Sequence, residues 1–217
     1  MTIGRLSVLA WTIAWGMMGV ALYISGVFNS PRTGPLWVAL AGGAIPWSIA
    51  GAFTFPDSVQ DASKRWHVSG FLSWALAYLL SFALAGFPGR ALNDTIGGFV
   101  FLILGWAVGP GAGAFVSTWR LTDDSKLGRS CIVAAFWILG FFAGTYVGFV
   151  GVYIGPELAK VLIGSLIGMN AAPILGFGVG SAAGGLVASA IAVTLTRAIS
   201  RFPRAIPAKL KKGRLQK

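Results

Sequence analysis

The chain has 217 residues, of which 56% are hydrophobic and only 11% are charged, and its formal net charge at pH 7 is +11. Soluble domains carry about 25% charged residues, so this composition excludes an ordinary water-covered surface. A lipid bilayer tolerates an apolar exterior, and the composition predicts an all-α integral membrane protein. The single cysteine, Cys131, and the single histidine, His67, exclude an intramolecular disulfide and a Cys/His zinc site.

Six apolar stretches are each long enough to cross about 30 Å of hydrocarbon, which takes roughly 20 helical residues. They lie near residues 6–28, 36–55, 66–86, 95–118, 131–154 and 171–196. The first is expected to be a retained span, because its apolar run exceeds the roughly 7–15 residues of a cleaved signal peptide and no A-x-A site follows it. The sequence thus predicts a single transmembrane domain, residues 1–196, followed by a basic cytoplasmic tail, residues 197–217.

With six spans, the termini and loops divide between the two sides of the membrane, and lysine and arginine are distributed unevenly between these sides. Fourteen lie on the side of the two termini and of the loops after the second and fourth spans, whereas Arg32, Arg90 and Lys160 lie on the other side. Because an excess of basic residues marks cytoplasmic segments, both termini are predicted to be cytoplasmic.

Internal similarity indicates three repeated helical hairpins, near 6–55, 66–118 and 131–196. The first span of each hairpin carries a tryptophan, and Trp11, Trp74 and Trp137 are 63 residues apart. The second spans share a pattern of glycines and small residues. A two-helix unit returns the chain to its starting side, so the pattern predicts a pseudo-threefold parallel repeat. The alternative is a chance match, since the chain contains 31 glycines and 9 tryptophans.

Glycines spaced four residues apart predict close helix packing in two of the spans. They are Gly105, Gly109 and Gly113 in the fourth span and Gly176, Gly180 and Gly184 in the sixth. Such small-xxx-small ridges let helix backbones approach closely in a membrane. We therefore expect the fourth and sixth spans to pack centrally.

The apolar segment 156–170 is too short to span a bilayer. It is expected to be an interfacial or re-entrant helix on the non-cytoplasmic side, or the start of a longer sixth span that breaks at Pro173.

No catalytic or metal-binding constellation is recognisable, and the chain is predicted not to be an enzyme. The absence of Asp, Glu, Lys and Arg from the middle of every predicted span argues against an ion-coupled transporter. His67 begins the third span beside an aromatic residue, which is typical of an interfacial histidine and less of a metal or pigment ligand. Ser165 lies in a Gly-Ser-Leu-Ile-Gly stretch, but the only histidine is predicted on the opposite side of the membrane.

The basic tail is the strongest electrostatic feature of the sequence. Its eight basic residues are Arg197, Arg201, Arg204, Lys209, Lys211, Lys212, Arg214 and Lys217, with no acidic residue among them. They are expected to contact anionic lipid or a partner, or else to serve only as a signal for membrane orientation. Nucleic acid binding is not expected, because one aromatic residue, Phe202, offers no stacking platform.

These features predict a non-catalytic integral membrane subunit that packs within, and stabilises, a larger complex with other membrane protein subunits. The membrane is expected to be the plasma membrane or an internal energy-transducing one. One alternative is a substrate-binding or facilitating transport component for a small neutral molecule, similar in size to the substrate-capture subunits of vitamin importers. Its pocket would be lined by Trp47, Ser48, Tyr78, Tyr146 and Asn170. A second alternative is an antenna subunit associated with a pigment or quinone; the sequence identifies no cofactor.

Overall fold

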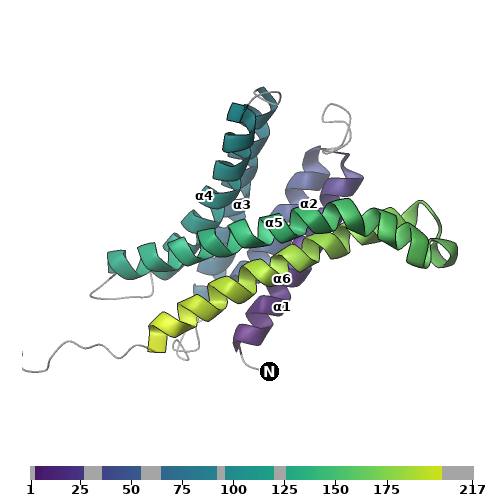
Figure 1. The fold of residues 1–217 in the computed structure, drawn as a ribbon. Coiled ribbons are helices and arrows are strands. Elements are labelled where there is room, and N and C mark those ends of the chain that lie inside the picture. Colours follow the sequence, from purple (N-terminus) through teal and green to yellow (C-terminus); the bar gives the residue numbers. More distant parts are fainter. Residues whose placement is uncertain (1–2, 27–35, 55–64, 92–95, 120–125, 202–217) are drawn as a thin grey trace, which may run out of the picture.

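The computed structural model describes residues 3–26, 36–54, 65–91, 96–119 and 126–201 (Figure 1). Within these residues the chain forms six α-helices and no strand. The helices are α1 (Ile3–Ile24), α2 (Leu36–Ala52), α3 (Arg65–Ala91), α4 (Ile96–Trp119), α5 (Lys126–Ile167) and α6 (Ala171–Arg201). The all-helical class predicted from the composition is therefore confirmed.

Three helices are long and apolar enough to cross a membrane. Within the described residues these stretches are Arg5–Ile24, Leu127–Ile167 and Ala171–Ala198. The second and third of these stretches contain the fifth and sixth predicted spans, and the first covers residues 6–24 of the first predicted span. Two shorter apolar helical stretches, Trp37–Ala52 and Gly70–Ala83, fall in the second and third.

Helix α5 is 42 residues long and continues through residues 156–167 without a break. Both expectations for this segment, a separate helix or the start of the last span, are therefore wrong. The helix ends at Gly168, whose φ of +93° lies in the left-handed region that glycine adopts without strain. The Gly168 amide donates to the Gly164 carbonyl at 2.9 Å. Pro173 falls in the first turn of α6, where its missing N–H is tolerated.

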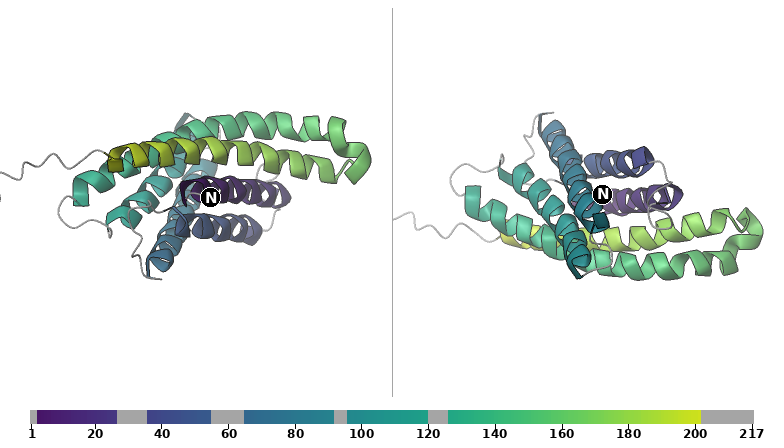
Figure 2. Two further views of the ribbon diagram at one scale, coloured as in Figure 1. Left: turned by 90° about the horizontal axis from the view of Figure 1, so that it is seen from below. Right: turned by 90° about the horizontal axis from the view of Figure 1, so that it is seen from above.

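Each of the six described helices packs against two others, its neighbours in the sequence, and α6 closes the ring by packing against α1. Helices α5 and α6 run side by side as an antiparallel pair, and the α3/α4 hairpin crosses them (Figures 1 and 2). The prediction that the glycine-rich helices α4 and α6 occupy the centre is wrong. One cluster of buried side chains, contributed by all six helices, fills the centre instead.

The α5/α6 hairpin reaches beyond the other four helices at one end (Figures 1 and 2). We call residues 158–170 of this end the hairpin tip. Its outer surface is apolar, with Val161 83% exposed and Leu166 81% exposed. The fold thus combines a filled centre with a projecting apolar end.

Candidate functional site

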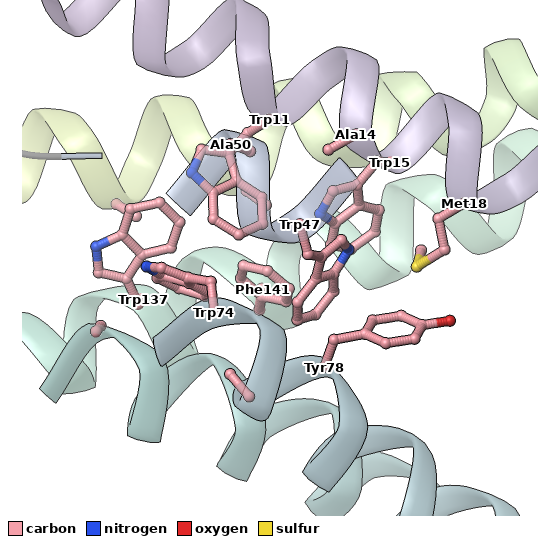
Figure 3. Close-up of a cluster of buried hydrophobic side chains, with 14 of the residues drawn as sticks. Trp11, Ala14, Trp15, Met18, Trp47, Ala50, Trp74, Tyr78, Trp137 and Phe141 are labelled. Atoms are coloured by element: carbon pink, nitrogen blue, oxygen red, sulfur yellow. The ribbon is translucent and has the colours of Figure 1, made fainter. Parts of the chain in front are cut away.

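A buried cluster of aromatic rings, here called the tryptophan hub, lies where α1, α2, α3 and α5 meet (Figure 3). It consists of Trp11, Trp47, Trp74, Trp137 and Phe141. None of these side chains is more than 2% exposed. Aromatic side chains are the largest apolar groups available to the chain, so the hub is the main packing element of the core.

The three tryptophans that are 63 residues apart in the sequence meet in the hub. The ring centroid of Trp11 lies 4.5 Å from that of Trp74 and 5.2 Å from that of Trp137, and the Trp74–Trp137 separation is 4.9 Å. The rings meet edge-on or tilted, which is the arrangement that aromatic quadrupoles favour. Three tryptophans that are widely separated in the sequence therefore converge on one point.

Sequence reasoning did not predict this cluster, which also contains Trp47 and Phe141. The Trp47 ring lies 5.6 Å from Trp11 and 5.2 Å from Phe141, and Trp15 contacts Phe141 at 5.1 Å. Trp47 is not part of the pattern from which the repeat is predicted. Helical periodicity relates Phe141 to Trp137, four residues earlier on the same face, and that spacing is the signal that could have found it.

Two hydrogen bonds connect the helices around the hub. The Trp11 indole N–H donates to Thr54 Oγ1 at 2.9 Å, which links α1 to the end of α2. The Tyr78 hydroxyl donates to the Ala39 carbonyl at 2.8 Å and links α3 to α2. The Tyr78 bond is buried, where an unmade bond would cost about 1–3 kcal/mol, and the Trp11 bond is partly buried. They fix the rotation of the first three helices relative to one another.

Elsewhere in the core, some hydroxyl groups bond to the backbone of their own helix. Ser48 and Ser189 each donate to the carbonyl four residues earlier in their own helix. The indole N–H groups of Trp15 and Trp74 are buried without a hydrogen-bond acceptor in the described part of the chain. No group of three His, Cys, Asp or Glu side chains that could hold a metal ion occurs among the described residues.

The predicted glycine ridge of α6 lies directly against glycines of α5. Gly176 faces Gly155, and Gly180 faces Gly151. A β-carbon built on Gly184 would lie 2.8 Å from the Cα atom of Gly148. These backbones therefore approach too closely for any side chain, and the contact forms a seam along the α5/α6 pair.

The glycine ridge of α4 packs against α3, and not against α6. A β-carbon on Gly109 would lie 2.5 Å from the Ala77 carbonyl oxygen, and one on Gly113 would lie 2.9 Å from the Trp74 ring. Gly105 is buried in the same helix. The second face of α6 contacts α1, where Gly185 lies against the Trp15 side chain.

Helix α5 contains a tandem heptad that sequence reasoning missed. Residues 142–148 read FAGTYVG and residues 149–155 read FVGVYIG. The glycines of both heptads face α6. The aromatic residues face outward: Tyr146 is 75% and Tyr153 73% exposed, and Phe142 and Phe149 are exposed as well. Self-similarity at a spacing of seven residues is the sequence signal for this two-faced helix.

Three of the described basic residues lie near one end of the helical ring, whereas Lys160 lies in the hairpin tip. Arg5 begins α1, Arg129 lies in the first turn of α5, and Arg197 lies in the last turns of α6. Because α6 runs antiparallel to α5, these ends coincide (Figure 1). Of the predicted contact residues in the tail, Arg201 ends α6, with a side chain outside the described part. The remaining six, Arg204, Lys209, Lys211, Lys212, Arg214 and Lys217, lie wholly outside the described residues.

The residues proposed to line a substrate pocket do not come together. Trp47, Ser48 and Tyr78 are buried in the core, with the Trp47 and Tyr78 rings 5.1 Å apart, whereas Tyr146 and Asn170 are exposed. The expectation of a single pocket from these five residues is wrong, because α5 turns its glycine face inward and its tyrosines outward. His67 lies near the start of α3, and its side chain is outside the described part.

Comparisons with protein-family models, with curated proteins and with solved structures find no match to this chain.

Proposed function

We propose that the protein is a non-catalytic, polytopic membrane subunit that packs within a larger membrane complex and stabilises it. The observation that carries this proposal is the length of α5 together with the apolar surface of its end. A helix of 42 residues is about 63 Å long, roughly twice the thickness of the hydrocarbon core. The hydrocarbon core of one bilayer therefore covers only about half of it.

The hairpin tip is the part that the bilayer leaves uncovered. Glu157 and Lys160, an exposed ion pair with an Nζ–Oε1 distance of 2.6 Å, mark the membrane surface on this side. Beyond Glu157, α5 continues for about 15 Å. This extension presents Val161, Leu162 and Leu166 outward. A contiguous apolar surface in water is typical of a protein contact, and we assign it to a partner subunit.

The remaining features of the proposal are six spans in three hairpins, with a pseudo-threefold axis through the hub and both termini in the cytoplasm. The convergence of Trp11, Trp74 and Trp137 supports the repeat, and the shared end of Arg5, Arg129 and Arg197 supports the orientation. The membrane is the plasma membrane or an internal energy-transducing one. The tail binds anionic lipid or an acidic partner, an attraction that salt screens over about 8 Å.

The subunit role predicts that charge on the hairpin tip removes partner proteins. In the double variant Val161→Glu/Leu166→Glu, two carboxylates must be desolvated at the contact, so we expect most of the partner to be lost. The matched control is Val161→Ile/Leu166→Ile, which keeps the surface apolar. The measurement is quantitative mass spectrometry of proteins that co-purify in mild detergent. If the charged variant retains the same proteins in the same amounts, the tip is not the contact.

The orientation predicts the accessibility of single cysteines in a Cys131→Ser background. Ser30→Cys and Asn93→Cys should react with a membrane-impermeant maleimide in intact cells, because both lie in predicted non-cytoplasmic loops outside the described residues. Ser125→Cys, in a predicted cytoplasmic loop outside the described residues, should react only after the membrane is made permeable. Reaction of Ser125→Cys in intact cells would overturn the six-span topology.

A further inference from the structure

We draw no further inference here: the strongest candidate, the pair of buried hydroxyl groups of Ser7 on α1 and Ser130 on α5, which have no hydrogen-bond partner in the described part of the chain and lie within two residues of Arg5 and Arg129 near one end of the helical ring, carries nothing, because α1 and α5 are not neighbours in the ring and nothing in the structure brings the two groups to one site.

Discussion

Replacing Trp74 with alanine is expected to lower the free energy of unfolding by about 3–5 kcal/mol, the range for aromatic residues removed from packed cores. Trp74 is fully buried, and its ring contacts Trp11, Trp137 and Trp47 at centroid distances of 4.5, 4.9 and 6.3 Å. The backbone of Gly113 lies against the same ring. Truncation to alanine would leave a cavity where the indole ring was. Because rigid backbone lies on one side of it and large rings on the other, the neighbours cannot move in to fill it, and the cavity persists.

Thermal unfolding in detergent, followed by circular dichroism, measures this loss. Trp37→Ala is the matched control, because Trp37 is 70% exposed near the start of α2 and its removal leaves no buried cavity. The control should unfold at nearly the wild-type temperature. If the two variants lose similar stability, the hub is not the main packing element of the fold.

Replacing Gly180 with leucine is expected to separate α5 from α6. Any side chain at this position meets the backbone of Gly151, which cannot move aside as a flexible side chain would. Overpacking of this kind lowers the free energy of unfolding by about 1–3 kcal/mol. Here the added side chain displaces α6 from α5 along the whole seam. The gain in helix propensity on removing a glycine, about 1 kcal/mol, offsets only part of this cost.

Ala183→Leu provides the control for the seam, because Ala183 lies three residues further along α6 and is exposed. We expect it to fold and assemble as the wild type does, whereas Gly180→Leu should yield less folded protein in membranes and unfold at a lower temperature. Gly109→Leu, which meets the Ala77 carbonyl of α3, should behave like Gly180→Leu. Normal stability of both glycine variants would show that the close approaches are not required.

Composition was sufficient to predict the helical class, and spacing singled out Trp11, Trp74 and Trp137 without predicting that they meet in the hub. An apolar chain has few alternatives to helices in lipid. The rotation of each helix about its axis could not be predicted in the same way. This rotation determines that the Trp47 and Phe141 side chains point inward and that the Tyr146 side chain points outward. It depends on contacts between helices that are far apart in the sequence.

Two errors of prediction have identifiable physical causes. One of the two alternatives for residues 156–170 made them the start of a last span that breaks at Pro173, but proline is tolerated in a first turn, and α5 ends at Gly168 in a left-handed conformation instead. The glycine ridges were taken to mark central helices. A ridge shows only that one neighbour is close: Gly109 lies against α3 and Gly180 against α5, both within a ring around the aromatic side chains.

The mass and protein composition of the particle extracted from its native membrane in mild detergent test the central claim most directly. The subunit role predicts a particle larger than two copies of this chain, containing a discrete set of other membrane proteins in fixed stoichiometry. Native mass spectrometry measures both quantities in one experiment. A particle that contains only one or two copies of this chain, with or without a bound small molecule, would contradict the role in a larger complex.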